Sequence, residues 1–294
     1  MKILITGLTG FIGKNFNNYS NYKNNFLAIS NKESINKNNQ LKNVNYIDCD
    51  IENINNFAVE IAKFNPDCVI NFAWKGIPDY SEKISNDNVN MTLNFFDFLE
   101  KNTKIKKYIN AGTCAEYFKP TGKISEDYLV SPESPFSEAK IILSDELKKR
   151  CERLEINYIN LRLFYVFGLY QRNESLIPHL VNSYKKEIIP KISNPFSKLD
   201  FIYVEDVISA IDCCIKNDIP SGSYNVGRGK SITNFEIQKI ISQKLNFSFE
   251  ENLNNKENVG LDFFADINKI NLYTGWSPKY EVHEGIQKIL EESN

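Results

Sequence analysis

Short apolar runs alternate along the chain with longer stretches in which apolar residues recur every three or four positions. The apolar runs predict strands at 2–6, 26–29, 46–51, 67–72 and 107–111. The longer stretches predict helices at about 53–64, 82–101 and 135–154. Because strand and helix alternate, we expect an α/β fold built on a Rossmann-like, doubly wound parallel sheet.

A glycine-rich turn links the first predicted strand to the helix that follows it. The residues of this turn are Gly7, Thr9, Gly10, Phe11, Ile12 and Gly13. Glycine permits the tight turn and lets a pyrophosphate approach the backbone, while the helix N-terminus supplies free N–H groups. Such glycines also occur in turns that bind nothing, but the strand before them and the helix after them favour a dinucleotide site.

The second predicted strand ends in Ser30, Asn31 and Lys32. At this place NAD-specific sites carry a carboxylate that binds the ribose 2′-hydroxyl. A hydroxyl, an amide and a cation suit a 2′-phosphate instead, because they donate hydrogen bonds and add positive charge. The sequence therefore favours NADP(H) as the cofactor, unless Lys32 is one of many solvated lysines.

Further segments resemble the extended short-chain dehydrogenase/reductase family, the NAD-dependent epimerase/dehydratase group, in order and over essentially the whole chain. They lie at 6–13, 50–51, 71–74, 88, 111–117, 140, 161–164, 200–207, 224–227 and 275–278. The residues at 73–74 and 112–117 are most similar to the corresponding segments of sugar-nucleotide 4-ketoreductases. The resemblance adds to the cofactor site Asp50 and Ile51 at the adenine, and also Phe72, Ala73, Trp74, Asn88, Ala111, Lys140 and Phe164.

The resemblance also implies two domains. Residues 1–165, with 200–217 returning to them, would form the dinucleotide-binding domain. Residues 166–199 and 218–294 would form a smaller α/β substrate domain that binds a nucleotide-diphosphate sugar.

Family members carry a Ser or Thr and a Tyr-x-x-x-Lys motif, whose Tyr and Lys lie one helical turn apart and face the nicotinamide. Thr113 and Lys140 stand at two of these positions. In the family the lysine lowers the pKa of the phenol and holds the nicotinamide ribose, and the phenol exchanges the proton on the sugar oxygen. The third position is Phe136, which fills the space of a tyrosine but has no proton to donate.

Phe136 leaves three interpretations open. It is a deliberate replacement of a native tyrosine, or another group (Thr113, Cys114 or Tyr165) donates the proton, or the protein has lost catalysis and only binds NADP(H). Losing a general acid costs about 10²–10⁴ in rate, so under the first interpretation Phe136→Tyr would raise 4-ketoreduction at least about a hundredfold. No gain would favour the other two.

The residues after Thr113 argue against two related reactions. Cys114 and Ala115 replace the acid/base pair with which family 4,6-dehydratases eliminate water. The epimerase-reductases that make GDP-fucose combine a His with a Cys two residues before the Tyr, whereas Cys114 precedes Tyr117 by three and His179 lies where the base pocket is expected. We interpret Cys114 as a buried thiol and His179 as a partly exposed imidazole.

The resemblance places the nucleotide sugar against residues from several segments. They are Trp74, Lys75, Thr113, Cys114, Tyr165, Arg172, Leu176, Ile177, Pro178, Lys198 and Arg228. The aliphatic members would serve equally well in a core. Leu199 stands where the family usually has an arginine for the diphosphate, so the cation would come from Arg172, Lys198 or Arg228. Arg162, in mid-strand, is expected in a buried structural ion pair.

Composition narrows the classes of partner. The formal net charge of −2 gives no reason to expect nucleic acid, and no apolar run approaches the roughly 18 residues of a membrane span. Six cysteines without a CxxC pair and two histidines show no zinc spacing, so no metal is expected. Scattered single cysteines fit a reducing cytoplasm.

The predicted helices 82–101 and 135–154 correspond to those that form a four-helix bundle between family subunits. A homodimer is therefore expected, with apolar surface from Leu93, Phe96, Phe98, Ile141, Leu143 and Leu147, unless these residues serve the core of a single chain.

These observations together predict an NADPH-dependent 4-ketoreductase. Its substrate would be a CDP-, dTDP- or GDP-linked 6-deoxy sugar, used for surface (capsular) polysaccharide. Two alternatives stay open. One is a nucleotide-sugar 4-epimerase, which would hold NAD tightly through oxidation and re-reduction. The other is a non-catalytic NADP(H)-binding protein, in which nothing replaces the hydroxyl missing at Phe136.

Overall fold

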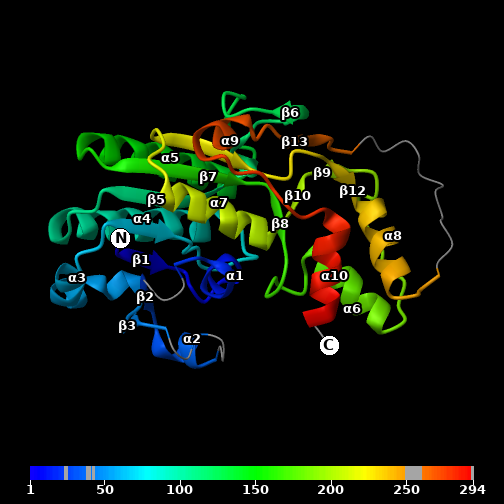
Figure 1. Cartoon of the computed structure of the whole chain (residues 1–294), viewed down its shortest axis with the longest axis horizontal. Coiled ribbons are helices and arrows are strands. Elements are labelled where there is room, and N and C mark those ends of the chain that lie inside the picture. Colours follow the sequence, from blue (N-terminus) through cyan, green and yellow to red (C-terminus); the bar gives the residue numbers. More distant parts are fainter. Residues whose placement is uncertain (23–25, 38–40, 42–43, 249–259, 293–294) are drawn as a thin grey trace.

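Seven parallel strands form the central sheet of the protein (Figure 1). The computed structural model describes residues 1–22, 26–37, 41, 44–248 and 260–292. From edge to edge the strands are β11 (Gly222–Val226), β7 (Asn157–Leu163), β5 (Lys107–Thr113), β4 (Cys68–Asn71), β1 (Ile3–Thr6), β2 (Phe26–Ser30) and β3 (Tyr46–Asp48). The five strands predicted from apolar runs are all present, so the Rossmann-like α/β fold is confirmed.

The order of the strands reverses beside β1. From β1 the chain continues through β2 to β3 at one edge, and it then returns to β4 on the other side of β1 and continues outward. In open parallel sheets, ligands bind outside the carboxyl ends of the strands at such a switch point. The fold therefore directs attention to the ends of β1 and β4.

Helices cover both faces of the sheet because successive residues of β1 point to opposite sides. Ile3 and Ile5 share a core with α1 (Phe11–Tyr19), α7 (Val204–Lys216) and α9 (Asn268–Thr274). Leu4 belongs to the opposite core, with the 3₁₀-helix η2 (Ile51–Phe57), α3 (Ala58–Phe64), α4 (Glu82–Asn102) and α5 (Pro135–Arg153). The short helix α2 (Lys32–Asn36) follows β2.

A second group of elements lies beside the sheet around its own apolar core (Figure 1). Its helices are η3 (Cys114–Glu116), α6 (Leu176–Lys185), α8 (Asn234–Lys244) and α10 (Val282–Glu292). Three two-stranded sheets complete it: β8 (Tyr165–Phe167) with β10 (Phe201–Tyr203), β9 (Lys198–Leu199) with β12 (Ile232–Thr233), and β6 (Gly122–Ile124) with β13 (Phe263–Ala265).

The division into two domains stays a prediction, and it differs from the observed arrangement at several segments. The elements η3, β6 and β10 lie in the second group, although their residues belong to the predicted dinucleotide-binding domain. The predicted substrate domain includes residues 218–294, yet β11 within that range pairs along β7 in the central sheet, from Gly222 opposite Ile159 to Val226 opposite Leu163. This boundary is corrected by the backbone hydrogen bonds of the sheet, which the apolar pattern of a short edge strand does not reveal.

Four of the six residues expected to give apolar surface for a dimer serve the core of a single chain, which was the alternative. Phe96, Phe98, Leu143 and Leu147 are at most 2% exposed, because they fill the core between α4, α5 and the sheet of a single chain. Leu93 and Ile141 are half-buried. Helices α4 and α5 do pack against each other within the chain, where ion pairs join Arg150 to Asp97 and Arg153 to Glu100.

A row of polar side chains crosses the buried sheet from β1 to β7. Thr6 Oγ1 donates to Asn71 Oδ1 at 2.6 Å, Asn71 Nδ2 to Asn110 Oδ1 at 3.1 Å, and Asn110 Nδ2 to Asn160 Oδ1 at 3.0 Å. The four residues stand directly opposite one another in the strand register. All four are at most 3% exposed, so each bond replaces hydration that burial removes. We call these four residues the polar row.

We expect Asn110→Leu to lower the free energy of unfolding by about 3 kcal/mol. It would leave the amide of Asn71 and the side-chain oxygen of Asn160 buried without partners, and each such group costs about 1–3 kcal/mol. Urea denaturation measures the change. Asn86→Leu, at an exposed position of α4, is the control and should stay within about 0.5 kcal/mol of wild type. Equal losses in both variants would contradict a structural role for the polar row.

No helix among residues 1–22, 26–37, 41, 44–248 and 260–292 combines the length and the apolar character required to cross a membrane.

Candidate active site

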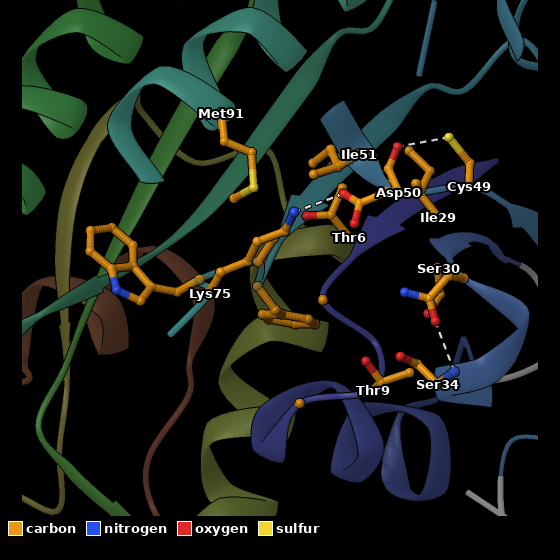
Figure 2. Close-up of a pocket in the computed structure, with 16 residues that line it drawn as sticks. Thr6, Thr9, Ile29, Ser30, Ser34, Cys49, Asp50, Ile51, Lys75 and Met91 are labelled. Atoms are coloured by element: carbon orange, nitrogen blue, oxygen red, sulfur yellow. Dashed lines mark hydrogen bonds and ion pairs between the residues drawn. The ribbon is translucent and has the colours of Figure 1, made fainter. Parts of the chain in front are cut away.

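A cavity of about 340 Å³ opens at the carboxyl ends of β1, β2 and β4, at the switch point of the sheet (Figure 2). Its wall is formed by Thr6, Gly7, Thr9, Gly10, Ile29, Ser30, Asn31, Ser34, Cys49, Asp50, Ile51, Phe72, Ala73, Trp74, Lys75 and Met91. The walls combine backbone, hydroxyl and apolar groups, as in sites that bind an elongated organic ligand. We call it the switch-point cavity.

Two of the three glycines are required by the backbone around them. Gly7 has φ +73°, and a Cβ there would lie 2.5 Å from the carbonyl carbon of Phe72. A Cβ on Gly13 would lie 2.4 Å from the carbonyl oxygen of Gly7. Gly10 is the N-cap of α1, and a Cβ on it would meet only the carbonyl oxygen of Gly7, at 3.3 Å. Gly7 and Gly13 therefore shape the turn, while Gly10 keeps the cavity wall open.

An ion pair crosses one end of the switch-point cavity. Lys75 Nζ lies 2.8 Å from Asp50 Oδ1 and 3.1 Å from Glu52 Oε2, and Figure 2 shows the lysine reaching toward Asp50. Burial raises the pKa of Asp50, but the hydrogen bonds from Lys75 and from the backbone outweigh it, so the pKa is lowered overall. Asn88 holds this loop, since its side chain accepts from the backbone N–H of Lys75 at 2.6 Å and donates to the carbonyl of Lys75.

Lys140, on α5, has a buried ammonium group. The residue is 8% exposed, and Nζ donates to the carbonyl oxygen of Ala111 at 3.0 Å. Nζ also lies 3.9 Å from the ring centroid of Trp74, a cation–π contact. Burial lowers the pKa of Lys140 from its usual 10.5 to about 8, against the attraction of Glu116. A buried lysine with a lowered pKa, whose ammonium lies beside the carboxyl-terminal part of a parallel strand, is a candidate for a functional site.

Phe136 lies in an aromatic cluster around Lys140. Its ring centroid is 5.3 Å from that of Trp74 and 5.1 Å from that of Tyr80, both edge to face. The ammonium of Lys140 is 5.8 Å from the Phe136 ring. The side chain at position 136 therefore packs beside the lysine and its aromatic partner, as the Tyr-x-x-x-Lys spacing predicts.

Thr113 ends β5 at the start of η3. Its hydroxyl oxygen accepts from the backbone N–H of Ala115 at 3.2 Å, and its own N–H donates to Glu116 Oε1 at 3.1 Å. The bond from Ala115 uses a lone pair of the hydroxyl, and the Thr113 side chain also forms a hydrogen bond with the thiol of Cys114. Thr113 and Ala111, whose carbonyl binds Lys140, are two residues apart on the strand and face the same side.

The buried ion pair expected for Arg162 is confirmed. Arg162 Nε donates to Glu116 Oε2 at 2.7 Å, and the two side chains are 9% and 1% exposed. Nη1 of the arginine donates to the hydroxyl of Tyr117 at 3.1 Å. Asn160, the end of the polar row, donates to the same carboxylate at 3.4 Å. Glu116 thus anchors the end of β5 beneath Thr113, a role the sequence prediction missed.

Most residues predicted at the sugar end are partly or wholly in the core. Cys114 is 7% exposed, and burial raises the pKa of its thiol to about 12, which agrees with the predicted buried thiol. Burial also raises the pKa of Tyr165, whose ring packs on other aromatic side chains. Ile177 is 1% exposed, whereas Leu176 and Pro178 are half-buried on α6.

The three candidate cations for a diphosphate differ in their partners. Arg228 forms a close ion pair with Glu281, and its side chain is 9% exposed. Lys198 Nζ lies 3.6 Å from Asp262 Oδ2. Arg172 is exposed and donates to two hydroxyl groups. Among the described residues, Arg172 is thus the one of the three that is bonded to hydroxyls and not to a carboxylate.

The structure brings ten of the predicted cofactor residues together in the wall of the switch-point cavity. They are Gly7, Thr9, Gly10, Ser30, Asn31, Asp50, Ile51, Phe72, Ala73 and Trp74. Predicted residues outside the wall are Phe11, Ile12, Gly13, Lys32, Asn88, Ala111, Lys140 and Phe164. The side chain of Lys32 is exposed, and its backbone N–H donates to Asp48 at 2.6 Å.

Six wall residues were not predicted for the cofactor, namely Thr6, Ile29, Ser34, Cys49, Lys75 and Met91. Thr6 and Ile29 are at or next to strand ends beside the glycine turn, which is a signal that sequence reasoning can use. Met91 comes from the middle of α4, and nothing in its local sequence marks it.

Comparison with known proteins assigns the family. Residues 3–227 match the NAD dependent epimerase/dehydratase family. The chain belongs to this family. Members of the epimerase/dehydratase family depend on a nicotinamide dinucleotide, and the residues present fit one: a glycine turn with Gly10 at the N-terminus of α1 lies in the wall of a cavity at the switch point. No group of three His, Cys, Asp or Glu side chains in the described parts of the chain could hold a metal ion.

Two relatives span nearly the whole length of this epimerase/dehydratase family member. The dTDP-4-dehydro-6-deoxyglucose reductase of Escherichia coli is 27% identical over 98% of this chain and 96% of its own. A putative UDP-glucose 4-epimerase of Methanocaldococcus jannaschii is 27% identical over 98% and 97%.

Solved structures of other proteins share this fold, and one of them is a Tyr-to-Phe mutant of UDP-glucuronic acid 4-epimerase from Bacillus cereus, in complex with UDP-4-deoxy-4-fluoro-glucuronic acid and NAD. Its TM-score is 0.84 at 23% identity, and the match covers 99% of this chain and 98% of that one.

Proposed function

We propose that this protein is an NADPH-dependent 4-ketoreductase that acts on a CDP-, dTDP- or GDP-linked 4-keto-6-deoxy sugar. The observation that carries the proposal is the buried ammonium of Lys140, held between the carbonyl of Ala111 and the face of Trp74, next to the strand that ends in Thr113. The full-length similarity to the reductase of E. coli supports the reaction class. The product would serve surface polysaccharide.

The residues of the switch-point cavity would hold the cofactor. The N–H groups at the start of α1, after Gly7 and Gly10, would bind its diphosphate, and Asp50 and Ile51 would contact the adenine. The nicotinamide supplies the hydride when it is bound. Ser30, Asn31 and Lys32 carry no carboxylate to repel a 2′-phosphate, which is why we propose NADP(H).

Lys140 and Thr113 would act at the reacting end. The ammonium of Lys140 can donate to the hydroxyls of the nicotinamide ribose, since it has three protons and one is used on Ala111. The Thr113 hydroxyl would hold the carbonyl oxygen of the sugar in place of its bond with the Cys114 thiol. Glu116 fixes the backbone of Thr113, so that this hydroxyl is positioned before the substrate arrives.

The sugar nucleotide would lie between these residues and the second group of elements, against Tyr165 and Arg172, whereas Lys75 stays paired with Asp50 in the wall of the switch-point cavity. We propose a homodimer through α4 and α5, now with the half-buried Leu93 and Ile141 as its apolar contacts. All six cysteines are free thiols, which supports a reducing cytoplasmic location.

The test offers the protein a panel of CDP-, dTDP- and GDP-linked 4-keto-6-deoxy sugars with NADPH or NADH. Reduction of the sugar is measured as the loss of absorbance of the cofactor. One sugar nucleotide should be reduced, with NADPH preferred at least about tenfold over NADH, which corresponds to about 1.4 kcal/mol. Thermal protection by each cofactor alone is measured beside it. No protection by either cofactor would exclude the proposed function.

The similarity to a putative UDP-glucose 4-epimerase makes 4-epimerisation the second candidate. Under this second function the same experiment should show no loss of NADPH or NADH absorbance, because an epimerase re-reduces its own intermediate and consumes no external cofactor. Purified protein that carries bound NAD and interconverts 4-epimers without added cofactor would establish this candidate in place of the reductase.

A further inference from the structure

We propose that Tyr80 supplies the proton that position 136 cannot, and this inference rests on the proposed ketoreductase function. Tyr80 lies in the loop between β4 and α4, where the sequence prediction assigns it no role. Its phenol would protonate the sugar oxygen while the carbonyl carbon is reduced.

The ring of Tyr80 packs directly on the residue that replaces the family tyrosine. The ring centroids of Tyr80 and Phe136 are 5.1 Å apart, with the planes at 68°. Trp74 packs on the same Phe136 ring and on the ammonium of Lys140. Among the described residues, Tyr80 is the tyrosine whose ring contacts this cluster, so a phenol is present beside position 136 although not at it.

The hydroxyl of Tyr80 is held with its proton free. Arg172 Nη2 donates to the Tyr80 oxygen at 3.2 Å, and Arg172 Nε donates to Ser175 Oγ at 3.3 Å. A guanidinium only donates, so the phenol oxygen is the acceptor in this bond. The phenol proton is therefore left for another acceptor, and the arginine fixes where the oxygen lies. Arg172 is a positioning residue in this scheme.

The donors considered from the sequence fit the task less well. The thiol of Cys114 is buried, and its pKa is raised to about 12. Tyr165 packs against Phe201 and Phe263, and burial raises its pKa. Tyr80 is 40% exposed, so water can return a proton to it after each turnover.

The carbonyl carbon of the sugar receives a hydride, which the nicotinamide cofactor of the proposed function supplies. The π pair of the carbonyl moves to the oxygen, and that oxygen takes the proton from the Tyr80 hydroxyl. Tyr80 is left as a phenolate next to Arg172, and a solvent proton restores it.

The experiment compares wild type, Tyr80→Phe, Phe136→Tyr and the double variant on the sugar nucleotide that wild type reduces. Tyr80→Phe should lower kcat at least about a hundredfold, the usual cost of losing a general acid, with little change in KM. Phe136→Tyr alone should change kcat little. The double variant should recover to within about tenfold of wild type, because the restored family tyrosine takes over the proton.

Two further measurements separate proton donation from a structural role. Thermal protection by NADPH should be the same for Tyr80→Phe and wild type, because the phenol does not hold the cofactor. Tyr273→Phe is the matched control, since Tyr273 on α9 is 43% exposed and lies outside the site, and it should retain full activity.

The outcomes distinguish this inference from the function on which it rests. Full activity in Tyr80→Phe overturns the inference and leaves the ketoreductase function intact. A double variant as slow as Tyr80→Phe also overturns it, since Tyr80 is then needed for packing. If wild type reduces no sugar but Phe136→Tyr does, Tyr80 is not the donor. If neither reduces any sugar, the proposed function fails as well.

Discussion

Lys140→Met is expected to lose activity and to gain stability. Turnover of the sugar nucleotide should fall at least about a hundredfold, because the ammonium that organises the reacting end is removed. The free energy of unfolding at pH 7 should rise by up to about 3 kcal/mol, because the folded chain no longer has to bury a charge whose pKa is lowered from 10.5 to about 8. The cation–π contact with Trp74 offsets part of this gain.

The lowered pKa of Lys140 also predicts how the stability difference between Lys140→Met and wild type changes with pH. Between pH 8 and 10.5 the unfolded chain keeps the proton of Lys140 and the folded chain has released it, so the stability of wild type rises with pH across this window. The advantage of Lys140→Met over wild type should therefore shrink from pH 7 to pH 10, as measured by urea denaturation. Lys148→Met, exposed on the same helix, is the control. A constant advantage would contradict the lowered pKa.

Alanine at two of the glycines should give opposite results. Gly13→Ala places a Cβ 2.4 Å from the backbone oxygen of Gly7 and 2.5 Å from Cα of Leu8, so we expect it to cost about 3 kcal/mol of stability. Gly10→Ala meets only one atom at 3.3 Å, so the fold should persist. Its methyl group would stand on the wall of the switch-point cavity, and NADPH affinity should fall at least about tenfold, or about 1.4 kcal/mol.

Thermal melting with and without NADPH measures both effects. Gly275→Ala is the control, since a Cβ there meets nothing within 4 Å and its φ of +70° costs stability only. It should melt lower and be protected by NADPH as wild type is. Full protection of Gly10→Ala would argue that the cofactor binds elsewhere.

The parts of the site that could be predicted from the sequence are those defined by short spacing. The turn from Gly7 to Gly13 and the separation of Phe136 from Lys140 depend on one turn of backbone, so local geometry decides them. Tyr80 and Met91 could not be found in this way. Both reach the site from outside these motifs, and only the packing of α4 and its preceding loop on the sheet brings them there.

For the buried ion pair, the sequence predicted one of the two partners but not the other. A lone arginine in a buried strand requires an acidic partner, so Arg162 could be assigned to an ion pair. That Glu116 is this partner, and that Arg228 is tied to Glu281, depends on contacts between distant segments. The same contacts decide which cations stay available for a substrate, and this is why the sugar end was less predictable than the cofactor end.

The polar row has a direction. Thr6, Asn71 and Asn110 each donate toward β7, and the last amide donates to the carboxylate of Glu116, which can only accept. An aspartate in place of Asn71 would set two acceptors face to face. Because the hydroxyl of Thr6 donates its proton to Asn71, it can only accept a hydrogen bond from a ligand in the switch-point cavity. The ion pair beneath Thr113 thus decides, three strands away, that Thr6 accepts a hydrogen bond from a ligand in that cavity and does not donate one.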